Sequence, residues 1–186
     1  MATDISLEQA LMLFKSANDD EFGQGMKVLF RRYVNRKETW DAFVQYFIDR
    51  PTTEIPRTLI YYLAHIPWHP DIVWTGDQPI TQETRDYGRQ LLSRFGRPEV
   101  IKLLACIEEE TGIERGSIGQ SVEGIVSSLP EIGPILSSIS EDPSLPVFIR
   151  ECAAFIGSMK ERRAASASWE DWRMQAQRIL RGASNR

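Results

Sequence analysis

The hydrophobic positions of this chain recur at helical spacing along most of its length. Leu7, Leu11 and Phe14 fall on one face of a helix, and Ser6 with Gln9 forms a capping box before it. Gly, Pro, Asn or Asp separate this stripe from the next ones. The pattern predicts an all-α fold of about ten helices with little or no sheet. Further apolar stripes lie within residues 26–33, 40–47, 55–66, 87–95, 100–107, 118–129, 132–139, 149–159 and 169–180.

Residues 67–80 interrupt the helical pattern. This segment contains three prolines and shows no sustained period, which predicts a long loop between helices with a short extended piece at 72–74. Loops of this length without regular structure are uncommon and are often functional. The loop is therefore the first candidate for a functional element.

The aromatic residues of this loop belong to no helical stripe. Trp68 and Trp74 lie within it, and Trp and Tyr dominate the energetics of many protein interfaces because they bury a large area at low entropic cost. In the alternative interpretation, both tryptophans fold back and fill a gap in the core. The residues that we expect to bind a partner are Trp68, Trp74, Tyr61, His69 and Asp71.

Length and composition are typical of a globular protein with its own core. The chain has 186 residues, of which 42% are hydrophobic and 26% charged, so it needs no metal or disulfide for stability. Cys106 and Cys152 lie in apolar helical patterns, which predicts buried, reduced thiols. The N-terminus lacks a secretory pattern and no apolar stretch reaches the ~20 residues of a membrane span. We therefore expect a cytoplasmic protein.

Three segments share one layout, which indicates an internal repeat. Residues 40–66 and 132–159 each combine an apolar helix, an acidic-Pro turn, a β-branched residue followed by an arginine, and a second apolar helix. Residues 100–129 resemble both. One helix pair cannot bury its apolar face alone, so neighbouring pairs are expected to stack.

The last of these segments resembles the HEAT-repeat class of armadillo-like α-solenoids. The match is best over residues 135–143, which end in Asp142-Pro143, and continues with Val147 and Arg150. The resemblance implies that the Asp-Pro pair turns the chain between two helices. It also implies that Arg150 hydrogen-bonds to the neighbouring repeat, which is a structural role and not a catalytic one.

This chain departs from the repeat pattern in its turn and in its spacing. Leu145 and Pro146 lengthen the turn, and the three arginines that match the pattern, Arg57, Arg115 and Arg150, are irregularly spaced. An irregular all-helical domain, whose segments look alike because amphipathic helices generally do, is the alternative.

We expect a single helical-repeat domain over residues 1–186, folded as a short right-handed α-solenoid. An N-terminal helix pair would span 1–36 and the repeats 37–163. A capping helix would span 168–181, followed by a disordered tail at 182–186.

Catalytic chemistry finds little support in the sequence. His65 and His69 are four residues apart and could bind a metal from one helix face, but Pro67 lies between them and the chain has no further histidine. Gly116 to Gln120 looks superficially like a phosphate cradle, yet it lacks a preceding strand and the lysine of a P-loop. We therefore expect no enzyme, no metal and no cofactor.

Clusters of basic residues support a competing hypothesis. Some helical-repeat proteins bind the backbone of DNA or RNA with such clusters. The 22 basic and 26 acidic side chains give this chain a net charge of −4, which argues against that function. Arg85, Arg89, Arg94 and Arg97 are the possible nucleic-acid-binding residues, and the other basic clusters are Arg31, Arg32, Arg36 and Lys37, and Lys160, Arg162 and Arg163.

The sequence thus favours a protein-protein interaction module. An adaptor, an inhibitor or a complex subunit would use a concave helical surface together with the loop at 67–80 to bind a partner. A nucleic-acid-binding repeat protein is the first alternative, and an immunity-type protein that neutralises a toxin is the second. The sequence identifies neither the partner nor the oligomeric state, and no membrane is expected to take part.

Overall fold

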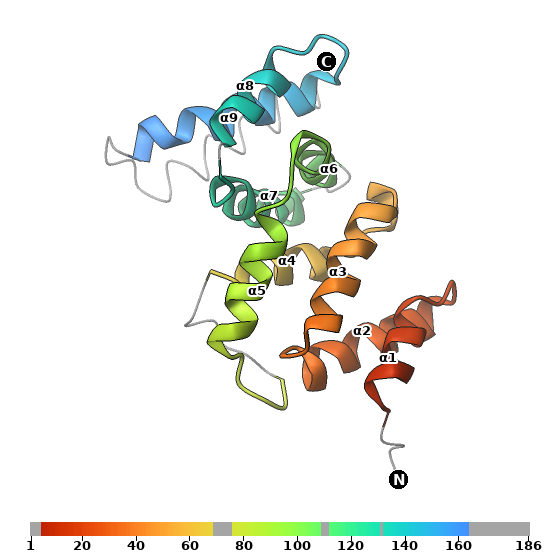
Figure 1. Cartoon of the computed structure of the whole chain (residues 1–186). Coiled ribbons are helices and arrows are strands. Elements are labelled where there is room, and N and C mark those ends of the chain that lie inside the picture. Colours follow the sequence, from red (N-terminus) through yellow and green to blue (C-terminus); the bar gives the residue numbers. More distant parts are fainter. Residues whose placement is uncertain (1–4, 69–75, 109–111, 131, 164–186) are drawn as a thin grey trace. The chain divides into compact units, whose positions relative to one another are not determined.

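Helices make up most of the part of the chain that the structure describes (Figure 1). The computed structural model covers residues 5–68, 76–108, 112–130 and 132–163, with side chains described except at 112–117 and 159–163. Within these residues there is no strand, which confirms the predicted all-α fold. The helices are α1 (Leu7–Phe14), α2 (Asp19–Tyr33), α3 (Lys37–Asp49), the 3-10 helix η1 (Thr52–Glu54), α4 (Arg57–His65), α5 (Gln82–Leu92), α6 (Arg97–Glu108), α7 (Gly112–Ser127), α8 (Ile132–Ser140) and α9 (Val147–Arg163).

Side-chain hydrogen bonds cap the N-terminal ends of α1 and α2. The backbone N–H of Gln9 donates to Ser6 Oγ at 3.2 Å, and the N–H of Ser6 donates to Gln9 Oε1 at 2.9 Å, so the predicted capping box is confirmed. Asn18 caps α2 by accepting from two backbone N–H groups. The stripe predicted over 55–66 begins later than expected, because Pro56 disfavours helical geometry at Ile55 and α4 starts at Arg57. The predicted helix at 168–181 and the tail at 182–186 lie outside the described residues.

The chain forms two compact units. Unit 1 comprises Met1–Asp49 and His65–Leu91, and unit 2 comprises Arg50–Ala64 and Leu92–Arg186. The chain therefore passes from one unit to the other three times. The single helical-repeat domain expected from the sequence stays a prediction.

An aromatic cluster forms the core of unit 1. Phe14 of α1 lies at ring-centroid distances of 5.2 Å from Phe43 and 5.0 Å from Tyr46, both on α3. Phe30 of α2 stacks on Phe43 at 4.4 Å. Such pairs contribute beyond the apolar area that they bury. Three helices therefore meet in this cluster, and the apolar stripes had predicted Phe14, Phe30 and Phe43 as core. Tyr46 was not predicted, and Phe22, which also lay in no predicted stripe, stacks on Phe14 at 5.1 Å.

Helices α1 and α2 cross at Gly25, where their backbones nearly touch. A Cβ atom at this position would lie 2.3 Å from the backbone nitrogen of Phe14 and 2.9 Å from the carbonyl oxygen of Ala10. Rigid backbone cannot move aside as a flexible side chain can, so only glycine permits this crossing. The close approach is what brings Phe14 into the aromatic cluster.

Replacement of this glycine therefore tests the packing of unit 1. We expect Gly25→Ala to lower the free energy of unfolding by about 1–3 kcal/mol, because the added methyl group forces α1 and α2 apart. Urea denaturation followed by circular dichroism measures this change. Gly23→Ala on the same helix is the matched control, because nothing lies within 4 Å of its Cβ position. It should instead stabilise the chain by about 0.5–1 kcal/mol, and equal effects of the two variants would contradict this account.

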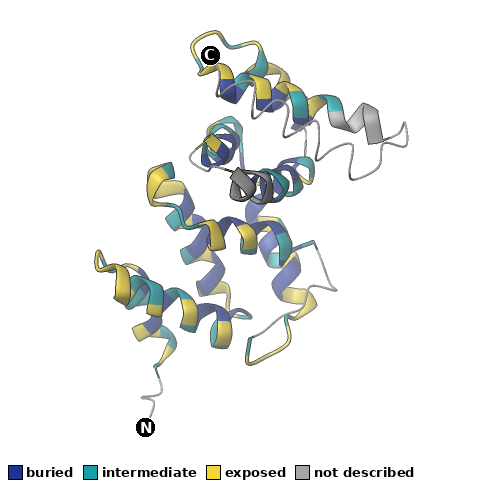
Figure 2. Cartoon of the chain, turned by 180° about the vertical axis from the view of Figure 1, so that it is seen from behind, coloured by how far each residue is buried: buried dark blue, intermediate teal, exposed yellow. Residues whose placement is uncertain are grey.

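Helix α6 forms the centre of unit 2, where it contacts η1, α7, α8 and α9. Val100, Leu103 and Leu104 are fully buried on its inner face. The same division into a buried and an exposed face runs along the other helices (Figure 2). Cys106 and Cys152 are each 6% exposed, so their predicted burial is confirmed.

The Asp142-Pro143 turn between α8 and α9 is tied to the start of α6. The Asp142 carboxylate accepts hydrogen bonds from the Ser144 hydroxyl at 2.6 Å and the Ser144 N–H at 2.9 Å, and forms an ion pair with Arg97. These interactions, those with Ser144 first, lower the pKa of Asp142 below its ordinary value. Arg150, which the HEAT resemblance singled out, has a buried Nε without a hydrogen-bond partner among the described residues.

The stability of unit 2 should depend on the ionisation of Asp142. Because its pKa is lowered in the folded state, the carboxylate stabilises the fold fully above its ordinary pKa of 3.8. This contribution is lost as the pH falls through the lowered folded-state value. We therefore expect Asp142→Asn to lower the urea midpoint at about pH 7 and to match the wild type at about pH 2. Glu141→Gln, a charge-matched neighbour, serves as the control. A constant difference between Asp142→Asn and the wild type across this range would rule out this ionic contribution.

Candidate functional site

The predicted loop at 67–80 is anchored at its start by two arginines of α5. Arg85 Nη1 donates a hydrogen bond to the carbonyl oxygen of Ile66, and Arg89 Nη1 donates to that of Pro67 at 2.7 Å. Arg85 is only 7% exposed, so its guanidinium needs such acceptors inside the fold. Arg89 also pairs with Asp86, which lowers the pKa of that carboxyl group. These bonds fix the chain as it leaves α4.

Close packing of α5 makes this anchoring possible. A Cβ atom at Gly88 would lie 3.0 Å from the ring of Trp40 and 3.1 Å from Pro67, which is tighter than ordinary contacts. Trp40 itself is 1% exposed and donates from Nε1 to the carbonyl oxygen of Val34 at 2.9 Å. The absent side chain at Gly88 thus lets α5 lie against α3 and the start of the loop.

Asn35 anchors the far end of the loop. Its Nδ2 donates to the carbonyl oxygen of Pro79 at 2.8 Å. Its Oδ1 accepts from the Thr81 N–H at 3.0 Å and from the Thr84 hydroxyl at 2.8 Å. Thr84 is 4% exposed, so its hydroxyl needs this acceptor, whereas Pro79 and Thr81 lie at the surface. One side chain therefore joins the end of α2 to the start of α5.

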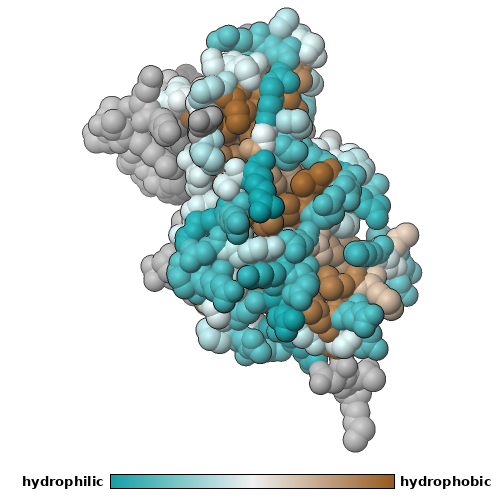
Figure 3. All heavy atoms as spheres, viewed as in Figure 1, coloured by the Kyte–Doolittle hydropathy of each residue, from teal (hydrophilic) through white to brown (hydrophobic). Residues whose placement is uncertain are grey.

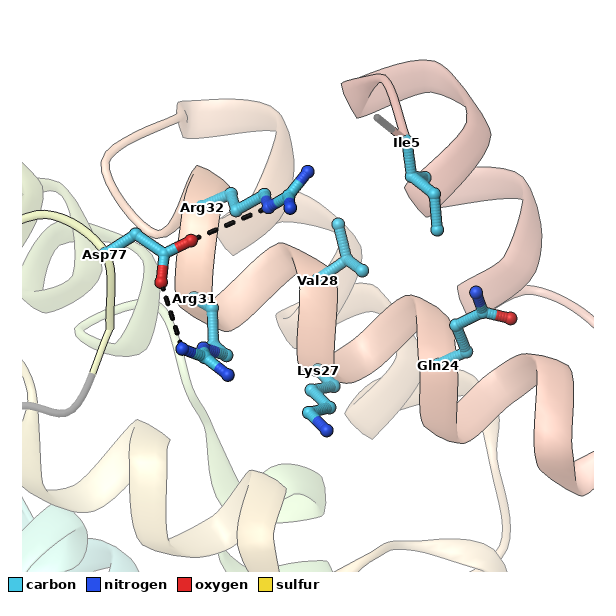
Figure 4. Close-up of a pocket in the computed structure, with 7 residues that line it drawn as sticks. All are labelled: Ile5, Gln24, Lys27, Val28, Arg31, Arg32 and Asp77. Carbon is cyan, nitrogen blue, oxygen red and sulfur yellow. Dashed lines mark hydrogen bonds and ion pairs between the residues drawn. The ribbon is translucent and has the colours of Figure 1, made fainter. Parts of the chain in front are cut away.

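Asp77 attaches the same loop end to the last turn of α2. Its backbone N–H donates to the carbonyl oxygen of Arg31 at 2.8 Å. Its carboxylate lies 3.2 Å from Arg31 Nη2 and 3.5 Å from Arg32 Nε (Figure 4). Arginines at a helix C-terminus are favoured by the helix dipole, and here they also hold a carboxylate from a distant part of the chain.

A pocket of about 370 Å³ lies beside this attachment point (Figure 4). Its position is fixed on one side by Asp77 and on the other by Ile5, whose carbonyl oxygen accepts a 2.9 Å hydrogen bond from the Tyr33 hydroxyl. The residues that line it are Ile5, Gln24, Lys27, Val28, Arg31, Arg32 and Asp77.

Only part of the predicted partner-binding set can be placed. Trp68 is half-buried at the anchored start of the loop. Tyr61 lies on α4 in unit 2 with 42% of its surface exposed, and its ring meets that of Tyr62 edge-on at 5.9 Å. His69, Asp71 and Trp74, together with the extended piece at 72–74, lie outside the described residues.

The predicted nucleic-acid-binding arginines differ in their surroundings. Arg85 is buried and Arg89 holds the loop, so both have structural contacts within unit 1. Arg94 is exposed, and Arg97 is paired with Asp142. The side chains of Lys160, Arg162 and Arg163 lie outside the described residues. Arg85 and Arg89 therefore have a physical explanation that requires no phosphate backbone.

No metal-binding cluster of His, Cys, Asp or Glu occurs among the residues that the structure describes. His65 ends α4, and its predicted companion His69 is not among those residues. In the same part of the chain, no helix is long and apolar enough to cross a membrane.

Comparison of the chain with known protein families, curated proteins and solved structures found no match. The functional argument therefore rests on the geometry of the residues themselves.

Several residues of this site were not identified from the sequence. Asn35 is a polar residue just after a helix, which predicts a helix end but not a bridge to residues 79–84. Lys27 stands apart from the basic cluster at 31–37, although a helical wheel places it one turn before Arg31. Gly25 and Gly88 carry no sequence pattern that distinguishes them from other helical glycines, because their role depends on neighbouring helices.

The anchoring role of Asn35 can be tested at one backbone amide. We expect Asn35→Ala to accelerate hydrogen exchange at the Thr81 N–H by about tenfold or more, because that amide loses its acceptor. NMR-detected exchange measures the rate. Gln24→Ala, at an exposed position on α2, is the control and should leave the rate unchanged. Unchanged exchange in Asn35→Ala would show that the loop end is held by other contacts.

Proposed function

We propose that this protein is a non-enzymatic protein-protein interaction module, such as an adaptor, an inhibitor or a subunit of a complex. Its partner would bind the loop at 67–80 and the adjoining surface of unit 1. The observation that carries this proposal is the anchoring of both loop ends, by Arg85 and Arg89 at one end and by Asn35 and Asp77 at the other. Fixed ends lower the entropic cost of ordering a loop on binding.

The surface around the loop suits recognition with a charged rim. Trp68 would supply one aromatic contact at the loop start that Arg85 and Arg89 hold. Trp74 would supply another aromatic contact, as expected from the sequence. Charged residues of α2 line the pocket beside Asp77, at the far end of the loop. They would orient the partner and raise the association rate. Hydrophilic residues cover most of the molecular face drawn in Figure 3, with smaller hydrophobic areas among them.

We also propose that the helix pairs form a short stack of HEAT-like repeats. Two observations support it in unit 2. Helices α6 and α7 pack together, as do α8 and α9, and α6 also contacts both α8 and α9. The Asp-Pro turn of one pair is ionically linked to the start of the other through Arg97. Stacked pairs of this kind would offer an extended binding surface.

Affinity capture with matched variants tests the proposed function. Tagged wild type and Trp68→Ala would be used to recover partners from a lysate of the source cells, with and without nuclease, and the proteins identified by mass spectrometry. We expect one stoichiometric protein that resists nuclease and whose affinity falls by about 2 kcal/mol or more in Trp68→Ala. Met12→Ala, which alters an apolar side chain that is 66% exposed on α1, is the control and should bind normally.

Three outcomes would overturn the proposal. Recovery that disappears with nuclease would favour the nucleic-acid alternative. A partner retained equally by Trp68→Ala and Met12→Ala would place the binding surface elsewhere. Loss of helicity in Trp68→Ala, seen by circular dichroism, would assign Trp68 to the core, as in the alternative interpretation of the sequence.

A further inference from the structure

The pocket on α2 is a positively charged site in an acidic chain. Three cationic side chains, Lys27, Arg31 and Arg32, line it together with one carboxylate, that of Asp77. The pocket therefore carries a formal charge of +2, against −4 for the whole chain. Such a local reversal of sign concentrates anionic groups at one place on the surface.

Lys27 and Arg31 face the same way from successive turns of α2 (Figure 4). Lys27 forms no ion pair or hydrogen bond among the residues that the structure describes, and its side chain is exposed. Four residues of helix separate the two cations by about 6 Å along the axis. Alternate side chains of an extended peptide are about 6.6 Å apart and point to the same side. Two acidic residues at positions i and i+2 of such a peptide would match this pair.

Asp77 shows that a carboxylate fits the cationic end of the pocket. Its two oxygens lie 3.2 Å from Arg31 Nη2 and 3.5 Å from Arg32 Nε. This carboxylate is 43% exposed, so it also competes with any incoming acidic group for Arg31. Its removal would leave the backbone bond from Asp77 N–H to Arg31 in place, because that bond does not involve the side chain.

An apolar surface lies next to the cations. Ile5, which precedes α1, and Val28 of α2 line the pocket (Figure 4), and the Tyr33 hydroxyl donates a hydrogen bond to the carbonyl oxygen of Ile5. A phosphate backbone offers no aliphatic side chain for this surface. An extended peptide that carries an aliphatic residue two positions from an acidic one would fill this surface and contact both cations.

We propose that this pocket binds an extended, acidic segment of a protein partner. Two carboxylates at alternate positions contact Lys27 and Arg31, and an aliphatic side chain two positions further along the segment, on the same side, packs on Ile5 and Val28. The inference deepens the proposed function and rests on it, since it specifies the chemistry of the partner. Recognition of acidic segments by clustered cations is a recurring mode of peptide binding.

A pair of labelled peptides tests this inference directly. The acidic probe is a fluorescein-labelled peptide of sequence Leu-Ser-Glu-Ser-Glu-Ser-Leu, whose Leu and Glu side chains point to the same side when the peptide is extended. The comparison peptide has Gln in place of both Glu residues. Fluorescence anisotropy measures the dissociation constants at low ionic strength. We expect the acidic probe to bind about tenfold more tightly than the Gln probe, and added salt to remove the difference.

Substitutions of residues that line the pocket show whether the acidic probe binds there. Lys27→Gln and Arg31→Gln should each weaken binding of the acidic probe by about threefold to fivefold. Asp77→Asn should strengthen it by about threefold, because the competing carboxylate is neutralised. Lys15→Gln, which removes an exposed cation just after α1, is the charge-matched control and should have no effect.

Contrary outcomes separate this inference from the proposed function. Equal binding of the two probes, or weaker binding by Asp77→Asn, would overturn the acidic-segment proposal. So would tighter binding of a thymidine oligonucleotide that depends on Lys27 and Arg31, which would assign the pocket to nucleic acid. If a captured partner requires Trp68 but is retained by Lys27→Gln/Arg31→Gln, the proposed function stands and this inference fails.

Discussion

The carbonyl groups at the C-terminal end of α2 impose the constraint on which unit 1 depends. The last turn of a helix leaves carbonyl oxygens without an intrahelical donor, and each must find one elsewhere. The oxygen of Arg31 accepts from Asp77 N–H, that of Tyr33 from the Thr39 hydroxyl, and that of Val34 from Trp40 Nε1. The donors come from the loop end and from α3. The hydrogen bonds to these carbonyl oxygens thus position the start of α3 and the far end of the loop.

The elements of the fold could be predicted from the sequence because they depend on local periodicity. Phe14, Phe30 and Phe43 were predicted as core and form the aromatic cluster of unit 1. The helix crossing that assembles this cluster was not predictable. Gly25 differs from Gly23 only in what lies opposite its Cβ position, which is the backbone of another helix in one case and open space in the other. Contacts of this kind exist only once the helices have packed.

The candidate site shows a similar division between what sequence reveals and what packing decides. The absence of periodicity in residues 67–80 predicted a loop, and the structure shows how its described ends are held, but charge alone could not separate the roles of the arginines. Arg85 is buried against a carbonyl oxygen, whereas Arg31 lines a pocket at the surface. The two residues have the same chemistry, and only their burial distinguishes a structural anchor from a possible binding residue. Lys27 lines the pocket because it shares a face of α2 with Arg31, although the two residues are not adjacent in the sequence.

Asp77 links the anchoring of the loop to the chemistry of the pocket. Its backbone holds the loop end on α2, while its side chain occupies two of the three cations that line the pocket. An acidic group that displaces this carboxylate therefore competes with one of the two attachments and leaves the other intact. Binding in the pocket and side-chain anchoring of the loop must then be coupled with equal magnitude in both directions. Because the backbone bond persists, the coupling is confined to the exposed ion pairs and is correspondingly modest. If the pocket binds an acidic segment as proposed, it would exchange an internal carboxylate for an external one without releasing the loop end.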